Sequence, residues 1–246
     1  MRYFVGGVNC MGLKYNRILL KISGEALGGE KGMGFDEAAM DAICGGVKKA
    51  YDLGVQIGIV VGGGNFWRGR TSGKMERTLA DKIGMLATVM NALAVSDKLA
   101  QLGVPSEVFS SIEMPKVAPV FDRKAALAAM EAGKVAVFGG GTGNPFFSTD
   151  TATALRAVEV SADVMFKATM VDGVYDKDPH KYPDAKKYDT LTFSKVLEDQ
   201  LAVMDGTAAT LCRDNKLPIL VFDLADPDNI ARAVQGENVG TLVYEG

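Results

Sequence analysis

The chain reads VAVFGGGTGNPFFSTD from Val135 to Asp150, and this stretch decides the fold class. Its first four residues form an apolar run typical of a buried strand, and the glycines after them let the backbone approach a ligand closely. Ser148 and Thr149 then favour the start of a helix. Because exposed amides at a helix N-terminus attract anions, the pattern predicts a strand, turn and helix that bind phosphate.

Two earlier stretches have the same form. VQIGIVVGGGN spans residues 55–65, and ILLKISGE spans residues 18–25. The carboxyl ends of parallel strands meet at one edge of a sheet, so the three turns together predict a crevice suited to phosphates. Both Gly-Lys pairs lack a following Ser or Thr, and neither glycine triplet has glycine at the sixth position. The crevice therefore belongs to neither the P-loop class nor the dinucleotide-binding class.

Apolar runs alternate with helix-length segments nearly to the end of the chain. This alternation predicts an α/β fold in which a mostly parallel central sheet is sandwiched by helices. Helices are expected at residues 36–53, 78–102, 123–132, 149–160, 193–202 and 228–234, and strands at 18–22, 55–61, 135–138, 163–167, 219–222 and 240–244, with shorter strands or loop edges at 108–110 and 117–120. We expect a single domain over residues 14–246, after an N-terminal extension, residues 1–13, that need not be ordered.

The longest expected helix carries an apolar stripe formed by Ile83, Leu86, Met90 and Leu93. Core packing and a subunit contact explain this stripe equally well. The same helix contains the longest uncharged stretch, residues 83–96. Because this stretch is shorter than the ~20 apolar residues that span a bilayer, we expect a soluble protein without a membrane segment.

Composition narrows the function classes. Of the 246 residues, 48% are hydrophobic and 23% charged, as in ordinary globular proteins, and the net charge of −3 gives no support to nucleic-acid binding. Cys10, Cys44 and Cys212 form no CxxC pair and the N-terminus has no secretory signal, which favours a reduced, cytoplasmic protein without a zinc site. His180, the only histidine, is expected in a solvated loop, which excludes histidine-based triads and metal sites.

Four polar side chains near the expected turns are candidates for nucleotide binding. Lys21 is either a solvated strand-end lysine or, beside the Ser23-Gly turn, a phosphate clamp. Arg68 follows the second glycine turn and suits bidentate phosphate contacts, although that turn can also be a simple tight turn. Asp81 either starts a helix or accepts hydrogen bonds from a ribose diol, and the ordinary interpretation of Asp205 is a capping or turn residue.

Five segments of the chain resemble the bacterial uridylate kinases, which have the amino acid kinase fold and are unrelated to P-loop nucleoside monophosphate kinases. The segments are ILLKISGEAL at 18–27, GGGN at 62–65 with Arg68-Gly, Asp81 with GMLATVMN at 84–91, TGNPFFST at 142–149, and KATMVDGVYDKDP at 167–179. They occur in order and with similar spacing, and the resemblance runs from about residue 15 to residue 244.

The resemblance implies reversible transfer of the γ-phosphoryl group of ATP to UMP, which gives UDP and ADP in pyrimidine nucleotide biosynthesis. It also implies activation by GTP, inhibition by UTP and a homohexamer. Residues 14–160 would form a lobe for UMP binding and oligomerisation, and residues 161–246 a lobe for ATP binding. Mg²⁺ would enter with ATP, held by nucleotide oxygens and water, since the sequence contains no cage of carboxylates and we predict no protein ligand for a metal.

The resemblance also assigns residues to each substrate. ATP would be held by Lys21, Ile22, Ser23, Gly24, Gly64 and Arg68 at its phosphates and by Thr169, Tyr175 and Asp178 at its adenosine. UMP would be held by Gly63, by Asp81 at the ribose, and by Thr142, Gly143, Asn144, Pro145, Phe146, Phe147, Ser148 and Thr149. Lys21, Arg68 and Asp205 would be catalytic, with Asp205 orienting the phosphate-binding lysine. Gly206 and Met170 depart from the usual family residues, which affects local packing only.

Two other functions remain open for this sequence. A kinase of the same fold could phosphorylate a carboxylate such as acetylglutamate or aspartate, although its acceptor loop need not read GNPFF. A binding protein of this fold could retain ATP or oxyanions without turnover. The presence of Lys21, Asp81 and Asp205 argues against this function.

Transfer to UMP needs no general base, because the second pKa of a phosphate monoester is about 6. That chemistry suits a chain with one histidine.

Overall fold

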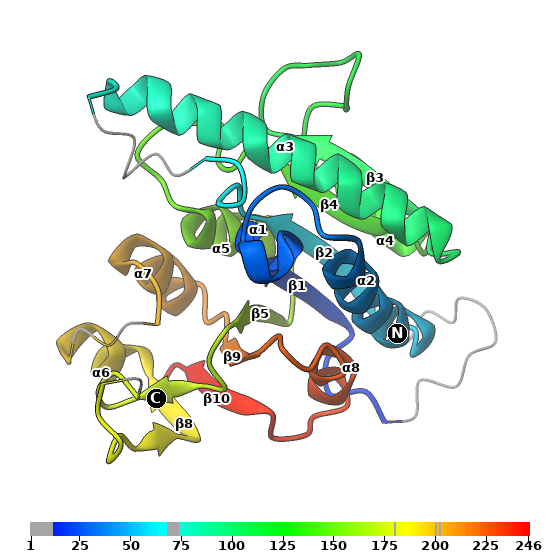
Figure 1. Ribbon diagram of the computed structural model, residues 1–246. Helices are drawn as coiled ribbons and strands as arrows, with labels where there is room; N and C mark the ends of the chain where they lie inside the picture. The colour runs from blue at the N-terminus through cyan, green and yellow to red at the C-terminus, as the bar shows by residue number, and fades with distance from the viewer. Residues whose placement is uncertain (1–11, 68–73, 180, 200, 202) are drawn as a thin grey trace.

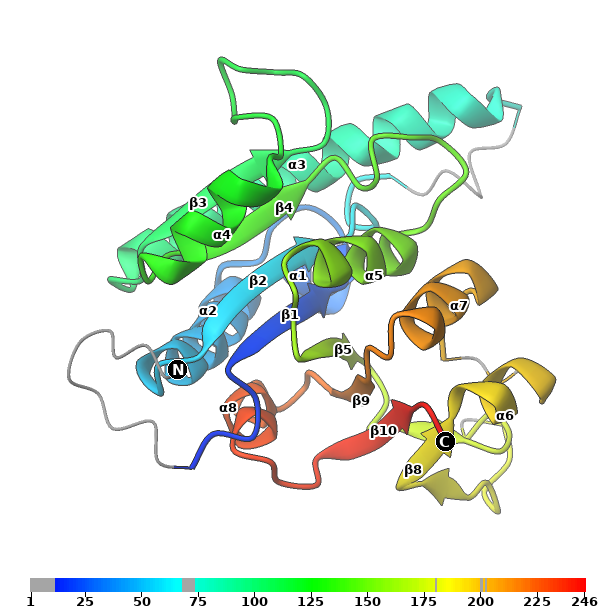
Figure 2. The ribbon, with the colours of Figure 1, turned by 180° about the vertical axis from the view of Figure 1, so that it is seen from behind.

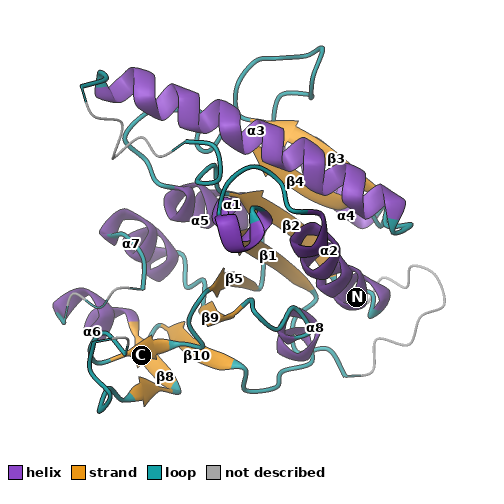
Figure 3. Cartoon of the chain, viewed as in Figure 1, coloured by secondary structure: helices purple, strands orange, loops and turns teal. Residues whose placement is uncertain are grey.

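The computed structural model describes residues 12–67, 74–179, 181–199, 201 and 203–246. Among them, eight strands form one sheet in the order β3-β4-β2-β1-β5-β9-β10-β8 (Figure 1, Figure 3). Its strands are β1 (Arg17–Ile22), β2 (Gln56–Val61), β3 (Ser106–Ser110), β4 (Val135–Gly139), β5 (Val164–Thr169), β8 (Thr190–Thr192), β9 (Ile219–Asp223) and β10 (Gly240–Tyr244). β6 (Val174–Tyr175) and β7 (Lys187–Tyr188) form a separate antiparallel pair.

The paired strands of the large sheet are parallel except for β9 and β10, which are antiparallel. Strands β4, β2 and β1, which lead into the three glycine turns, are direct neighbours. Their carboxyl ends therefore lie at the same edge of the sheet. The predicted α/β fold is confirmed, and so is the predicted meeting of the three turns.

Helices cover both faces of the sheet (Figure 1, Figure 2). They are α1 (Gly24–Leu27), the 3-10 helix η1 (Gly29–Lys31), α2 (Glu37–Asp52), α3 (Arg77–Gln101), α4 (Arg123–Glu131), α5 (Thr149–Glu159), α6 (Phe193–Glu198), α7 (Gly206–Asp214) and α8 (Asn229–Val234). One core joins the sheet to α2, α3 and α8, and a second joins its other face to α4, α5, α6 and α7. Successive side chains of a strand point to opposite faces of the sheet, so each strand contributes to both cores. In β1, Leu20 belongs to the core with α2, α3 and α8, and Leu19 belongs to the core on the other face.

The apolar stripe of α3 lies on the surface. Leu86, Met90 and Leu93 are exposed, and Leu79 continues the stripe towards the start of the helix. The opposite face of α3, which includes Asn91, packs on the sheet. Core packing is therefore the wrong explanation of the stripe, and a subunit contact stays a prediction.

Within the described ranges α3 alone has the length and hydropathy of a membrane span, but here it packs against β3 and β4.

The sequence analysis did not predict α1, η1, β6, β7, β8 or α7. Further differences concern the ends of the predicted elements. Glu76 rather than Asp81 caps α3, because its carboxylate accepts the first free backbone amides of the helix. The helix expected at 193–202 ends at Glu198, and the strand expected at 163–167 extends to Thr169. Segment 117–120 forms only isolated bridges. Residues 1–11, Arg68 and His180 lie outside the described residues, so their predicted roles are untested.

Candidate active site

Two cavities open at the edge of the sheet where the glycine turns meet. Cavity 1 measures about 550 Å³ and cavity 2 about 600 Å³, and Glu25 lines both. Cavity 1 is lined by Glu25, Gly63, Gly64, Trp67, Arg77, Asp81, Gly84, Met85, Thr88, Gly141, Thr142, Asn144, Phe146, Phe147, Ser148, Thr149, Asp150 and Asp205. Cavity 2 is lined by Lys21, Ser23, Glu25, Ala26, Gly29, Gly32, Ala39, Ala42, Ile43, Lys167, Ala168, Thr169, Met170, Leu224, Ala225 and Pro227. Each has the size of a small-molecule site.

Two lysines and one carboxylate lie where the two cavities adjoin. Lys21 near the end of β1 and Lys167 in β5 occupy paired positions on neighbouring strands. Asp150, in the first turn of α5, lies between them: its Oδ1 is 3.4 Å from the Lys21 Nζ and its Oδ2 is 2.5 Å from the Lys167 Nζ. All three side chains are about 15% exposed. This cluster places two ammonium groups in contact with one shared carboxylate, and the charge of the Asp205 carboxylate also acts on Lys167.

Burial and charge act in opposite directions on Asp150. Burial alone would raise the pKa of its carboxyl, but the ammonium groups of Lys21 and Lys167 outweigh burial and hold that pKa below its usual value. For Lys167, burial is the largest effect and lowers the pKa of the ammonium, although Asp150 opposes it. The cluster thus keeps Asp150 ionised and holds the Lys21 and Lys167 side chains where the two cavities adjoin, a position from which they can contact a phosphate group.

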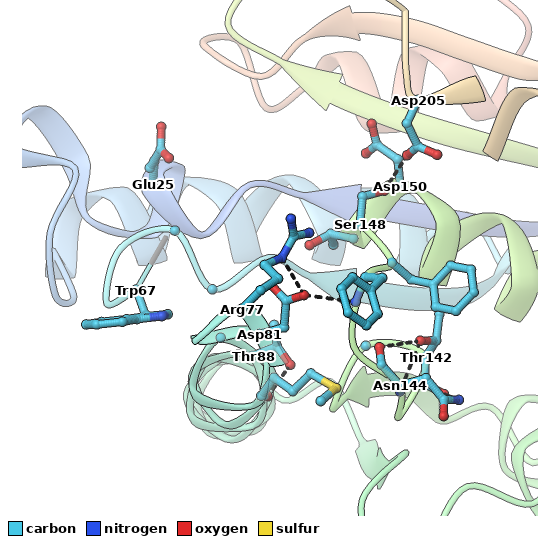
Figure 4. A pocket seen from close by; sticks show the side chains of 18 residues that line it. Glu25, Trp67, Arg77, Asp81, Thr88, Thr142, Asn144, Ser148, Asp150 and Asp205 are labelled. Atoms are coloured by element: carbon cyan, nitrogen blue, oxygen red, sulfur yellow. Dashed lines mark hydrogen bonds and ion pairs between the residues drawn. The ribbon is translucent and has the colours of Figure 1, made fainter. Parts of the chain in front are cut away.

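Asp205 joins the start of α7 to the start of α5. It caps α7 by accepting a hydrogen bond from the Ala208 amide at 3.1 Å. Its carboxylate also accepts hydrogen bonds from the hydroxyls of Ser148 and Thr151, the second at 3.0 Å. Figure 4 shows Asp205, Ser148 and Asp150 side by side at one end of cavity 1. Both interpretations of Asp205, cap and site residue, are compatible with this geometry, and its orienting role for a lysine stays a prediction.

The first two glycine turns touch each other directly. A Cβ atom on Gly24 would lie 2.5 Å from the Gly62 carbonyl oxygen and 2.8 Å from the Gly64 amide nitrogen, so only glycine permits this contact. Two buried amides fix the second turn: Asn91 donates to the Gly62 carbonyl at 2.5 Å and to Asn65 at 2.7 Å. The close approach leaves the turn backbone facing cavity 1.

Asp81 ties α3 to the third glycine turn. Its Oδ2 accepts hydrogen bonds from the Arg77 Nε at 2.7 Å and from the Phe146 amide at 2.8 Å (Figure 4). Phe146 has a φ of 73°, a strained conformation for a residue with a side chain. The Arg77 guanidinium lies 5.6 Å from the centre of the Phe146 ring. Arg77, Asp81 and Phe146 all line cavity 1, so these contacts form one wall of that cavity.

Most of the predicted site residues line one of the two cavities, and their assignment to a substrate stays a prediction. Of the residues predicted to bind UMP, Gly143 and Pro145 alone do not line cavity 1. Of those predicted to bind ATP, Lys21, Ser23 and Thr169 line cavity 2 and Gly64 lines cavity 1. Ile22, Gly24, Tyr175 and Asp178 line neither cavity: the Ile22 side chain is fully buried in the core, and the Tyr175 hydroxyl donates to Asp172 at 2.7 Å.

Sequence reasoning missed three residues of the site. Lys167 carries the same signal as Lys21, a lysine inside an apolar strand, and was assigned no role. Asp150 was recognised only as part of a helix start, because its contact with β1 depends on the order of strands in the sheet. Arg77 gave no signal, since an arginine in the first turn of a helix is ordinary. No group of three or more His, Cys, Asp or Glu side chains suited to a metal occurs in the described part of the chain.

Comparisons with known proteins agree with the fold. The sequence pattern of the amino acid kinase family matches residues 16–223. The structure of a UMP kinase from Bacillus anthracis is similar with a TM-score of 0.91 and 36% identity, covering 94% of this chain and 96% of that one. A UMP kinase from Ureaplasma parvum is similar with a TM-score of 0.89 and 35% identity, covering 95% of this chain and 100% of that one. A uridylate kinase from Archaeoglobus fulgidus is similar with a TM-score of 0.69 and 29% identity, covering 92% of this chain and 99% of that one.

Proposed function

The chain belongs to the amino acid kinase family, and we propose that it is a UMP kinase that transfers the γ-phosphoryl group of ATP to UMP in pyrimidine nucleotide biosynthesis. The observation that carries this proposal is the cluster of Lys21, Lys167 and Asp150 where two nucleotide-sized cavities adjoin. The reaction forms UDP and ADP and is reversible.

UMP occupies cavity 1 in this proposal. Asp81 accepts hydrogen bonds from the ribose, and Thr142 to Thr149 surround the base and phosphate. ATP places its phosphates in cavity 2 at Lys21 and Ser23, with its adenosine towards Thr169. The division into a UMP lobe up to about residue 160 and an ATP lobe after it is approximate, because Asp205 lines cavity 1 and Lys21 lines cavity 2.

The chemistry then follows from charge and position. A UMP phosphate oxygen, ionised at neutral pH, attacks the γ-phosphorus of ATP, and the bond from that phosphorus to the β-phosphate oxygen breaks. Lys21 and Lys167 contact the transferring group from where the two cavities adjoin and offset its negative charge. Asp150 holds both ammonium groups in place, and the turn amides near Gly63 and Gly64 orient the two phosphates. No side chain needs to accept a proton.

The residues present fit a Mg²⁺ ion that arrives with ATP. Asp150 Oδ1 is the one buried carboxylate oxygen in the described residues without a hydrogen bond, and it can accept one from a metal-bound water. Because no protein cage gathers there, phosphate oxygens and water would supply the other ligands. Bound Mg²⁺ would neutralise charge on the ATP phosphates.

We propose a homohexamer in the cytoplasm, with GTP as activator and UTP as inhibitor. Support for an oligomer comes from the exposed stripe of Leu79, Leu86, Met90 and Leu93 on α3, since apolar patches of this kind mark protein contacts. Buried, unpaired Cys44 and Cys212 are compatible with a reducing compartment. The effectors rest on the family resemblance alone.

Product analysis tests the proposed reaction. We expect Mg-ATP and UMP to give UDP and ADP in equal amounts, as measured by phosphorus NMR. We expect Lys21→Ala to abolish the signals of both products. Lys48→Ala is the matched control, because Lys48 pairs with Asp52 on the surface of α2, away from both cavities. ADP without UDP would show hydrolysis rather than transfer and would reject the proposal.

A further inference from the structure

We infer that Arg156 and Ser111 are positioning residues that hold the acceptor turn, residues 139–143, in the shape that binds UMP. This inference rests on the function proposed above. Neither residue lines cavity 1 or cavity 2, so both would act through the turn rather than by touching a substrate.

Arg156 is a buried cation on α5. Its side chain is only 6% exposed, and its guanidinium stacks on the Phe121 ring with 3.9 Å between Cζ and the ring centre. One end of the guanidinium donates to Glu159, and Nη2 donates to the Ser111 hydroxyl at 2.9 Å. The buried Nε has no hydrogen-bond partner, so the contacts with Glu159, Phe121 and Ser111 offset the cost of burying this guanidinium and place it.

Ser111 connects Arg156 to the acceptor turn by hydrogen bonds. Its amide donates to the Gly139 carbonyl at 3.0 Å. Its hydroxyl lies 2.7 Å from the Gly141 carbonyl oxygen and 3.3 Å from that of Gly139, so Gly141 is the closer acceptor. A hydroxyl has one proton and two lone pairs, so donation to Gly141 leaves Ser111 free to accept from Arg156. The hydrogen bonds therefore run in one direction, from Arg156 to Ser111 to Gly141.

The turn itself has little freedom to move away from Ser111. Gly140 and Gly143 both have a φ of 81°, which other residues rarely adopt. A Cβ atom on Gly143 would lie 2.9 Å from the Ser111 carbonyl oxygen. On its other side the turn is held by α3, where the Thr88 hydroxyl accepts a hydrogen bond from the Gly140 amide at 2.8 Å.

A shift of the turn would alter one cavity and leave the other intact. Gly141 and Thr142 line cavity 1, whereas no residue of the turn lines cavity 2. Loss of the Ser111 hydroxyl should therefore weaken UMP binding and spare ATP binding. A general loss of packing would affect both substrates together.

Kinetics of Ser111→Ala test the inference. We expect the KM for UMP to rise about 10-fold, the effect of losing a hydrogen bond to a partly buried carbonyl, with the KM for ATP unchanged. Arg156→Lys keeps the charge beside Glu159 but loses the planar fork, and should act in the same direction. Should Arg156→Lys fail to fold, Ser111→Ala alone carries the test.

Arg123→Ala is the matched control. Arg123 donates to the Glu159 carbonyl at 2.6 Å, so it anchors the same end of α5 from α4, but it has no contact with the acceptor turn. Both KM values should stay unchanged in this variant. Hydrogen exchange of the ligand-free protein gives a second readout: peptides covering residues 139–148 should exchange faster in Ser111→Ala than in Arg123→Ala.

Two results would overturn the inference. One is a KM for UMP in Ser111→Ala equal to that of the wild type, and the other is an equal rise in both KM values. Failure of the proposed function is separately visible, because the wild-type protein itself would then not phosphorylate UMP.

Discussion

Lys21 and Lys167 occupy paired positions on the neighbouring parallel strands β1 and β5, so two ammonium groups lie side by side at the edge of the sheet. Like charges in this position repel each other, and in the described residues Asp150 forms an ion pair with both lysines while the charge of Asp205 also acts on Lys167. Two lysine side chains where two cavities adjoin suit an anionic ligand such as a phosphate group. That property makes the pair the centre of the proposed phosphoryl transfer.

Removing the shared carboxylate should disable the enzyme. Asp150→Asn leaves Lys21 and Lys167 without their anion, which should lower kcat at least 100-fold, about 3 kcal/mol of lost stabilisation, and destabilise the fold by a similar amount. Steady-state kinetics and urea unfolding measure the two effects. Asp52→Asn, which breaks a surface pair with Lys48, should change neither. Full activity of Asp150→Asn would remove Asp150 from the mechanism.

Asp150 should also make stability depend on acid pH. Its pKa is lower in the folded than in the unfolded protein, so its stabilising effect is complete above the ordinary value of about 4 and is lost as the pH falls through the folded-state pKa. The difference in the free energy of unfolding between wild type and Asp150→Asn should therefore shrink below about pH 4. A difference that stays constant from pH 7 to pH 3 would contradict the lowered pKa.

Buried cysteines should be unreactive in the native protein. Burial raises the pKa of the thiols of Cys44 and Cys212 to about 12 each. At pH 8 their alkylation by iodoacetamide should be at least about 1,000-fold slower than that of free cysteine, and should become rapid in denaturant. Mass spectrometry of each peptide distinguishes the two residues. Fast native labelling of Cys212 would show that α7 does not stay packed on α5.

The exposed stripe on α3 should hold subunits together. Met90→Glu introduces a charge into this stripe, so we expect the oligomer to dissociate into smaller species in light scattering after gel filtration. Met33→Glu is the matched control, because Met33 is 75% exposed but lies in the loop before α2. A monomeric wild type, or a Met90→Glu variant of unchanged mass, would reject this interface.

Much of the fold could be predicted because local signals agree with the global structure. Apolar runs that end in glycines predicted β1, β2 and β4, and the observed ends differ from those expected by one residue. The order of strands could not be read from the sequence, nor the antiparallel pairing of β10. The stripe on α3 was ambiguous because periodicity reports which residues share a face and not what covers that face.

The site was predictable where chemistry and local pattern coincide. Lys21, the glycine turns and the segment from Thr142 to Thr149 gave signals of their own. Asp150 did not, because the sheet order brings it to Lys21 from 129 positions along the chain. The hydrogen bond from Arg156 to Ser111 could not be predicted either, since an arginine on a helix is ordinarily a surface residue.

The choice of phosphoryl acceptor tests the central claim most directly. ADP release by the purified protein with Mg-ATP can be compared for UMP, CMP, dUMP and acetylglutamate as acceptors. Strong turnover with UMP, far above that with acetylglutamate, is the predicted result. Tight ATP binding with no release of ADP for any acceptor would contradict the account and indicate a nucleotide-binding protein, and turnover with acetylglutamate alone would indicate a carboxylate kinase.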